Sequence, residues 1–265
     1  MKKFYTAVQS MISSNRQGLM GMVVQGDTIV CPTGSKLLLD ELGQELLGEI
    51  KSEILAEIKP EASEIILAKK PRVLVVPFEE KELTIYLEPL NTKTHLVILG
   101  GGHIAVPLAR MGKLLDYRVT VVDDRPSFAN SARFPEVDQV ICDDFQKTIR
   151  RLAVDNNTYI IIVTRGHQHD RTCLNEVLKK PDWAYTGMIG SRRKVTAVLK
   201  ELEESGLESA LLNRVYTPIG LDIGAQTPEE IAVSIMAEII MVQHKGFSSG
   251  LGSKAGGILS GQKSN

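Results

Sequence analysis

The sequence is poor in the features that mark several classes of protein. Its 265 residues include only three cysteines, widely separated and without a C-x-x-C pair, so neither a disulfide framework nor a cysteine-rich zinc site is expected. No apolar run approaches the roughly 18 residues that a membrane span needs, and the N-terminal lysines lead into polar residues rather than a signal-peptide core. The net charge of −1 argues against a nucleic-acid binder. We therefore expect a cytoplasmic protein that engages neither membranes nor nucleic acids.

The length and composition suit a globular protein of two domains. Apolar residues make up 43% of the chain and charged residues 24%, which is ordinary for such proteins. We expect a small N-terminal α+β domain over 1–92 and a larger domain over 93–246. The remaining stretch, 247–265, is rich in glycine and serine and is predicted to be a flexible tail.

Within the first domain, short apolar runs predict strands and one long segment predicts a helix. Met20–Val24 and Thr28–Val30 flank Gly26-Asp27, a pair typical of hairpin turns. Leucines and isoleucines recur at helical spacing over 37–58, which predicts an amphipathic helix interrupted near Gly43. Two further strands are predicted at 72–77 and 83–87.

In the second domain, strand-like and helix-like stretches alternate. Apolar, β-branched runs predict strands at 95–100, 118–123, 138–142, 159–164, 186–190 and 214–219. Such alternation favours an α/β fold with a Rossmann-like, doubly wound and mostly parallel sheet of strand order 3-2-1-4-5-6. The last helix has a clear start, because Thr227 is followed by Pro228 and the capping-box residue Glu230.

The stretch from 95 to 125 has the order of a dinucleotide-binding βαβ unit. A buried strand runs into Gly100, Gly101 and Gly102, and a helix and a second strand ending at Asp123 and Asp124 follow. Gly100 would permit the tight turn, and Gly102 would let the backbone approach a diphosphate. Asp123 is placed where a carboxylate can hold a ribose hydroxyl.

Histidines cluster in two loops that this strand order brings together. The first strand ends in GGGH, up to His103, and the fourth ends in RGHQHD, Arg165 to Asp170. Ligands of doubly wound sheets bind where the winding reverses, between these two strands. We expect the loops to contact a ligand. Two alternatives remain open: His167, His169 and Asp170 as metal ligands, and a purely structural loop in which Asp170 caps the next helix.

Two further loops carry charge at the ends of later strands. In MIGSRRK, Ser191 is the expected N-cap, and Arg192, Arg193 and Lys194 fall in the first helical turn, where cations oppose the helix dipole unless an anion binds. A solvated basic helix start is the open alternative. In the last loop, glycines flank a single carboxylate, Asp222, which suggests a close approach between the backbone and either a ligand or a neighbouring strand.

With these residues in place, the second half resembles the XdhC/CoxI family of xanthine dehydrogenase accessory proteins. The matching stretches run in order over 85–240: IYLEPL, LVILGGGHIAVPLA, VTVVDDRPSFAN, VTRGHQHD, MIGSRRK and PIGLDIGAQTPEEIAVSIMAEI. The first half is similar only loosely: SSNRQG is a variant of a family segment, and CPTGSK stands where the family often has a glycine-rich turn with a cysteine.

The resemblance implies a maturation factor for molybdenum hydroxylases. It would act as a cofactor chaperone rather than a catalyst, binding the molybdenum–pterin cofactor and assisting its sulfuration and insertion. The expected partners are an apo-hydroxylase and a cysteine desulfurase, and base rates favour a homodimer. The residues expected to bind the cofactor are Gly100, Gly101, Gly102, His103, Asp123, Asp124, Arg125, Arg165, Gly166, His167, His169, Asp170, Gly190, Ser191, Arg192, Arg193 and Asp222.

Two other functions remain open on the residues alone. An NAD(P)-dependent oxidoreductase is compatible with the glycine turn and Asp123, and Arg125 could accommodate a 2′-phosphate. Against it, no substrate domain follows the glycine-rich unit. A nucleotide-sensing regulatory module is the third possibility, since a small N-terminal domain would suit it.

Overall fold

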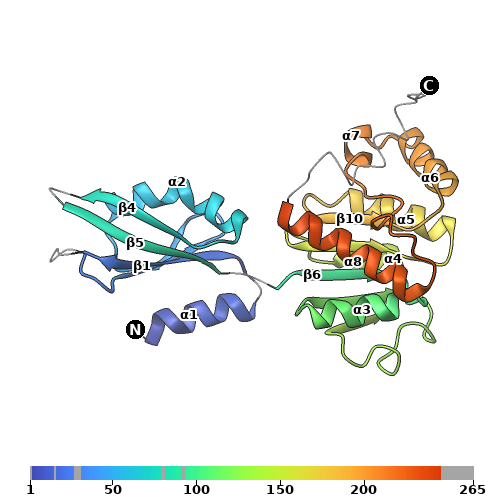
Figure 1. The fold of residues 1–265 in the computed structure, drawn as a ribbon, viewed down its shortest axis with the longest axis horizontal. Helices are drawn as coiled ribbons and strands as arrows, with labels where there is room; N and C mark the ends of the chain where they lie inside the picture. The colour runs from blue at the N-terminus through green and yellow to red at the C-terminus, as the bar shows by residue number, and fades with distance from the viewer. Residues whose placement is uncertain (1, 15, 27–30, 79–80, 91–92, 246–265) are drawn as a thin grey trace. The chain divides into compact units, whose positions relative to one another are not determined.

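The computed structural model describes residues 2–14, 16–26, 31–78, 81–90 and 93–245. The chain divides into two compact units, 1–92 and 93–265 (Figure 1). Among the described residues, no helix has the length and apolar character needed to cross a membrane.

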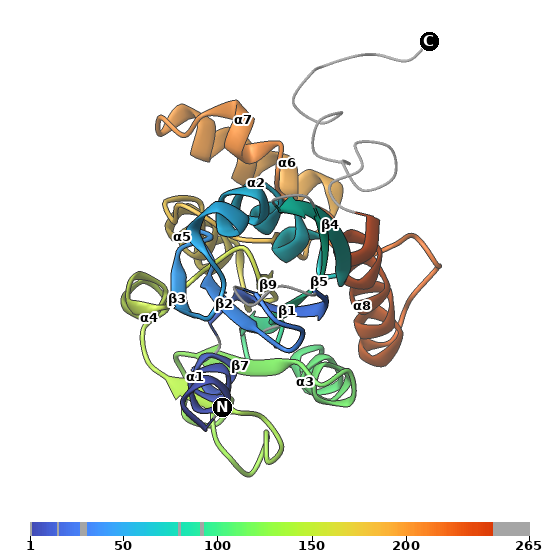
Figure 2. The same cartoon turned by 90° about the vertical axis from the view of Figure 1, so that its left-hand side faces the viewer.

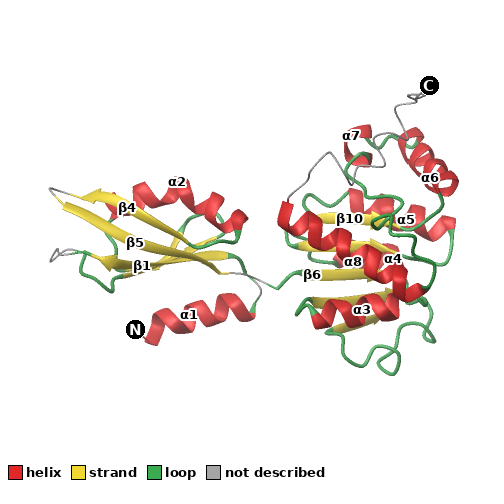
Figure 3. Cartoon of the chain, viewed as in Figure 1, coloured by secondary structure: helices red, strands yellow, loops and turns green. Residues whose placement is uncertain are grey.

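The first unit is an antiparallel sheet with a helix on each face (Figure 3). Its elements are α1 (Lys2–Ser13), β1 (Gly18–Gln25), β2 (Lys36–Asp40), β3 (Glu45–Gly48), α2 (Ser52–Ala68), β4 (Arg72–Phe78) and β5 (Lys81–Leu90). The strand order is β3-β2-β1-β5-β4. Apolar residues of α2 pack on one face, and Phe4 and Met11 of α1 pack on the other. The strands expected at 72–77 and 83–87 are confirmed as β4 and β5.

The helix predicted over 37–58 is confirmed only from Ser52 onward and is wrong before it. The segment forms β2, a turn with Gly43 at φ +72°, then β3 and only the start of α2. The reason is burial on both faces of the sheet: Leu37 and Leu39 pack towards α2, whereas Leu38 packs towards α1. A strand covered on both sides is continuously apolar and lacks the alternation that would have identified it.

The hairpin predicted around Gly26-Asp27 is only partly described. Its first strand is confirmed within β1, which pairs with β2 and β5. Its second strand, 28–30, lies outside the described residues, as does the tail predicted for 247–265.

The second unit is a parallel α/β sheet of strand order β10-β9-β6-β7-β8. Its elements are β6 (His95–Leu99), α3 (Ala105–Leu114), β7 (Arg118–Asp123), β8 (Gln139–Cys142), α4 (Phe145–Arg151), β9 (Thr158–Ile162), α5 (His167–Leu178), β10 (Tyr185–Met188), α6 (Arg192–Glu204), α7 (Ser209–Leu212) and α8 (Pro228–Lys245). In order of appearance the strands lie 3-2-1-4-5, so the winding reverses between β6 and β9. The Rossmann-like fold class is confirmed.

Helices cover both faces of this sheet. Figure 2 shows α3 and α8 side by side, with α4 and α5 across the sheet from them. Alternate residues of each central strand supply the two cores: Leu96 and Ile98 of β6 pack with α3 and α8, and Val97 and Leu99 pack with α4, α5 and α6. This two-sided burial explains the unbroken apolar character of the strands.

The sixth strand predicted at 214–219 does not form. The segment lies beside β10 but makes a single bridge, from Tyr216 to Gly187. Pro218 has no N–H group with which to extend the pairing. The expected start of the last helix is confirmed: Thr227 Oγ1 accepts a bond from the Glu230 N–H at 3.2 Å, and Glu230 accepts one from the Thr227 N–H at 3.1 Å.

Candidate functional site

The two histidine-bearing loops meet at the carboxyl edge of the parallel sheet. Because β6 and β9 are neighbours, the GGGH turn and the segment from Val163 to Asp170 begin side by side. The Val163 N–H donates to the Leu99 carbonyl at 2.9 Å, which continues the ladder to the start of both loops. The predicted adjacency of the two strand ends is therefore confirmed, whereas His103 lines a cavity beside α8 and no contact between described residues joins it to His167 or His169.

The three glycines of the turn have different surroundings. Gly100 has φ +111°, and a Cβ there would lie 2.5 Å from the Val163 carbonyl oxygen. At Gly101 a Cβ would lie 2.3 Å from the Phe128 carbonyl oxygen. At Gly102 it would meet no heavy atom within 4 Å, and the same holds for Gly166 in the facing loop. Gly100 and Gly101 therefore serve the fold, whereas Gly102 and Gly166 border open space that a ligand can enter.

Asp123 cannot bind a ribose hydroxyl, which is the role that the sequence predicts for it. Its side chain is buried, and its two carboxylate oxygens accept four bonds: from the Gly101 N–H, the Arg125 N–H, and Nε and Nη2 of Arg125, at 2.8–3.0 Å. A carboxylate offers about four acceptor positions, so none is left for a ribose hydroxyl. Burial alone would raise the pKa of Asp123, but the bonds from Arg125 and Gly101 outweigh it and hold the pKa below its ordinary value. Asp123 instead ties the glycine turn to the end of β7.

An ion pair crosses the end of β6. Nη2 of Arg165, in the loop after β9, lies 2.9 Å from Oδ2 of Asp124, which follows β7. The same guanidinium contacts Nε2 of His169 at 3.2 Å. Since β6 lies between β7 and β9, this contact spans the point where the winding reverses. Of the predicted residues, the structure thus joins Asp124, Arg165 and His169 directly.

Asp170 does not cap the following helix, so the capping role is wrong, but its contacts lie within the chain as the structural alternative expected. Helix α5 begins at His167 with Gly166 as its N-cap, and Asp170 lies fully buried in the first turn. Its carboxylate accepts a bond from Thr164 Oγ1 at 2.5 Å and pairs with Lys194 Nζ at 2.5 Å. Asp170 therefore joins the start of α5 to α6.

The alternative metal site does not assemble. His167, His169 and Asp170 lie within one helical turn rather than an extended loop, and their contacts diverge. His167 lies 3.9 Å from Glu201, whereas His169 contacts Arg165. Within the described ranges of the chain, no group of three such side chains could hold a metal ion.

The MIGSRRK loop forms as predicted. Ser191 Oγ caps α6 by accepting the Lys194 N–H at 3.4 Å, and Arg192 and Arg193 are exposed in the first turn. Among the described residues, neither arginine forms an ion pair. Gly190 is half-buried and packs against Val195. This end of α6 therefore keeps two uncompensated positive charges at the carboxyl edge.

The loop containing Asp222 is arranged by contacts within the chain. Gly220 has φ +95° and lies so close to α8 that a Cβ would be 2.4 Å from Ser234 Oγ, so the close approach expected here is made to a helix rather than to a strand. Asp222 itself is exposed, and no contact between described residues joins it to the other candidates.

Arg133 is a residue of this edge that the sequence did not reveal. Its Nε donates to the Gly101 carbonyl at 2.9 Å and its Nη2 to the Gly102 carbonyl at 3.2 Å. It comes from the irregular stretch between β7 and β8, which has no periodicity to align it with the glycines. Thr164, which donates to Asp170, also lies outside the helices and strands and was not predicted as a site residue; Lys194, which pairs with Asp170, belongs to the MIGSRRK segment, but its partner was not predicted.

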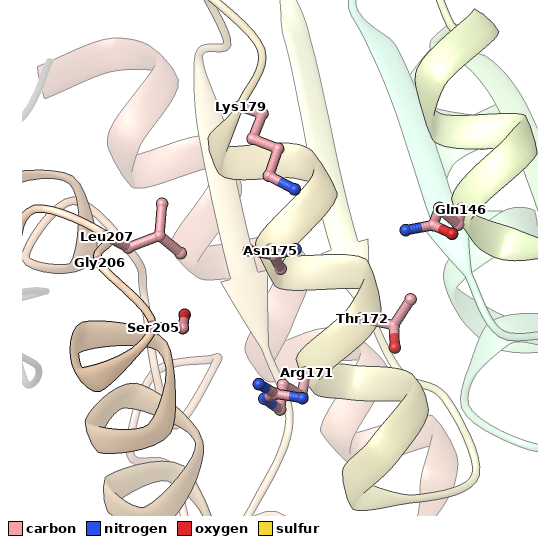
Figure 4. Close-up of a pocket in the computed structure, with 8 residues that line it drawn as sticks. All are labelled: Gln146, Arg171, Thr172, Asn175, Lys179, Ser205, Gly206 and Leu207. Carbon is pink, nitrogen blue, oxygen red and sulfur yellow. The ribbon is translucent and has the colours of Figure 1, made fainter.

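A separate cavity of about 510 Å³ lies along α5, between Gln146 of α4 and the turn after α6 (Figure 4). Its cationic side chains already have partners. Arg171 pairs with Glu201 at 3.2 Å, and Lys179 pairs with the buried Glu176 at 3.0 Å. We assign no site there.

Comparison with known proteins places these observations in a family. The sequence model of the XdhC Rossmann domain matches residues 96–239. The chain is 30% identical over 172 residues to a Bacillus subtilis protein described as a probable xanthine dehydrogenase subunit, covering 65% of the chain and 50% of that protein. It is 29% identical over 163 residues to the Escherichia coli "Uncharacterized protein YqeB", covering 61% of the chain and 30% of that protein.

The chain thus spans half or less of the length of these relatives. Among solved structures, a crystal structure described as a xanthine dehydrogenase from Bacillus halodurans is similar, with a TM-score of 0.51 at 18% identity. The match covers 92% of this chain and 97% of the other, and it supports the fold alone.

Proposed function

Since the chain belongs to the XdhC family, we propose that it is an accessory protein of a molybdenum hydroxylase of the xanthine dehydrogenase type. In this proposal it binds the molybdenum–pterin cofactor at the carboxyl edge of its parallel sheet and assists the sulfuration and insertion of that cofactor. The name of the Bacillus subtilis relative supports the choice of client enzyme.

The observation that carries the proposal is the open space beside two glycines at the carboxyl edge of the parallel sheet. Gly102 and Gly166 lie in the loops that follow the neighbouring strands β6 and β9, and a Cβ at either position would meet no heavy atom within 4 Å. Both precede helices whose first turns have no side-chain cap, so backbone N–H groups are free to meet an anion. Arg192 and Arg193 are exposed at the start of α6, which follows β10, the strand next to β9, and are the cations that we assign to the same anion. This donor set fits the phosphate or diphosphate of a pterin cofactor.

When bound, the cofactor supplies the molybdenum centre that the client enzyme needs. The residues of this chain would hold and orient its anionic end: the backbone at Gly102 and Gly166 by hydrogen bonds, and Arg165 and the two arginines of α6 by charge. We assign the delivery of sulfur to a cysteine desulfurase partner and no covalent step to this chain.

The saturation of Asp123 favours this cargo over a nicotinamide dinucleotide. A dinucleotide bound in the usual way needs a free carboxylate after the second strand for its ribose. Here all four acceptor positions of Asp123 are used within the chain, and Arg125 covers it.

Gly102→Val tests the site. Gly102 has neither a positive φ nor a close neighbour, so valine is accommodated by the fold while it fills the space that the cofactor would enter. We expect at least about a tenfold loss of affinity for anaerobically released molybdenum–pterin cofactor. The control is Ala197→Val, which adds similar bulk at an exposed position of α6 and should bind as the unmodified protein does. Equal binding by both variants, each with native circular dichroism, would remove the site from this edge.

A further inference from the structure

A second cavity lies beside the glycine turn, between the starts of α3 and α8. Its volume is about 390 Å³, and it is lined by His103, Pro107 and Arg110 on one side and by Pro228 and Glu229 on the other. Figure 2 shows the two helices next to each other. The backbone and arginine groups assigned above to the cofactor do not line this space. Arg133 does line it, as does His103, which the sequence placed among the cofactor-binding residues.

Arg133 is held rigidly in this wall but is not neutralised. Two of its nitrogens bond to the carbonyls of Gly101 and Gly102, and its guanidinium lies 5.3 Å from the centre of the Phe128 ring. Carbonyl oxygens and an aromatic ring orient a guanidinium without cancelling its charge. A fixed, uncompensated guanidinium is preorganised for an anion, because little side-chain entropy is lost on binding.

Arg110 adds a second uncompensated cation. Within the described part of the chain it forms no ion pair, and neither does Glu229, the acidic residue that lines the same cavity. The two arginines therefore converge on one space, with the imidazole of His103 beside them. Two guanidinium groups match a phosphate dianion better than a single carboxylate, because each can donate two parallel hydrogen bonds.

An adjoining apolar cavity indicates what the phosphate is attached to. It has a volume of about 150 Å³, shares Arg110 and Arg133 with the first cavity, and is walled by Phe134, Pro135 and Val137. Glu136 also lines it and, in the described residues, pairs with neither arginine. An apolar cavity of this size accommodates a single benzene-like ring.

We propose that the two cavities together form a binding site for an aromatic phosphomonoester. The phosphate lies between Arg110 and Arg133, and the ring lies against Phe134 and Val137. The site is on the α3–α8 side of the glycine turn and does not depend on cofactor binding at the β6–β9 junction.

The test uses phenyl phosphate as the probe, with inorganic phosphate and phenol as its two halves, in calorimetric titrations of the full chain. Phenyl phosphate should bind at least about tenfold more tightly than either half, because both cavities are filled at once. Arg110→Gln should weaken binding about tenfold, and its exposed position keeps the fold intact. Lys200→Gln removes one positive charge from an exposed site on α6 and should leave the affinity unchanged.

Amide chemical shifts locate the probe. Shifts at 106–111 and 133–137 that disappear in Arg110→Gln support the proposal. Shifts confined to 100–102 and 165–170 would overturn it in favour of the β6–β9 junction. The proposal also fails if millimolar phenyl phosphate does not bind, or if Arg110→Gln binds it as tightly as Lys200→Gln does.

Discussion

The glycine turn gives a sharp prediction, because two glycines of one turn should respond in opposite ways to one added methyl group. At Gly100, alanine would have to adopt φ +111° with its Cβ 2.5 Å from a carbonyl oxygen and 2.8 Å from the carbonyl carbon of Val163. Those atoms belong to backbone packed at the end of β9 and cannot move aside. Conformational strain alone costs about 1–3 kcal/mol, so with the clash we expect a destabilisation of about 3 kcal/mol or more.

At Gly102 the same substitution meets open space without a positive φ. Alanine there reduces the freedom of the unfolded chain and should stabilise the protein by about 0.5 kcal/mol. Trp183, the one tryptophan of the sequence, is buried in the second unit and reports its unfolding by fluorescence. We expect the melting temperature to fall by roughly 10 °C for Gly100→Ala and to stay level or rise for Gly102→Ala. Equal destabilisation by both variants, or a native melting temperature for Gly100→Ala, would refute this description of the turn.

Three further predictions concern buried and exposed groups. Cys142 is exposed and should react rapidly with a thiol reagent in the native protein. Burial raises the thiol pKa values of Cys31 and Cys173, so these two should react only on unfolding. Three rapidly reacting thiols per chain would contradict this prediction. Burial lowers the pKa of His95 to about 4, so on acidification the unfolded chain binds a proton at a higher pH than the folded chain does. The unfolding free energy should therefore fall by on the order of 3 kcal/mol between pH 6.5 and pH 4. Urea unfolding across that range checks this, and an unchanged slope in His95→Gln would disprove the assignment. Lys194→Met should cost about 3 kcal/mol, because Asp170 would stay buried without its cation; a change in unfolding free energy below about 1 kcal/mol would show that the pair is unimportant.

The sequence predicted the parts of the fold that local pattern encodes. Runs of β-branched residues separated by helical stretches predicted the five parallel strands, and the strand order predicted that the GGGH turn and the Arg165–Asp170 loop follow neighbouring strands. Prediction failed where tertiary burial decides the conformation. The leucines of 37–39 form a strand because helices cover both faces of their sheet, and segment 214–219 makes one bridge because Pro218 cannot extend the pairing.

In the candidate site, too, local sequence pattern predicted some features, whereas others depend on tertiary packing. The glycine spacing identified the turn, but it could not show that Gly100 and Gly101 are packed while Gly102 is open. It also could not show that Asp123 is saturated by Arg125, or that Arg133 binds the carbonyls of the turn. Such contacts depend on side-chain placement over irregular segments, for which the sequence has no periodic signal.

The most direct measurement is a side-by-side titration of the purified protein with anaerobically released molybdenum–pterin cofactor and with NADH, followed by fluorescence. The proposed function predicts that the pterin cofactor binds at micromolar concentration or more tightly and that NADH binds negligibly. NADH binding without pterin binding would contradict it, and the β6–β9 junction would then be a nicotinamide site.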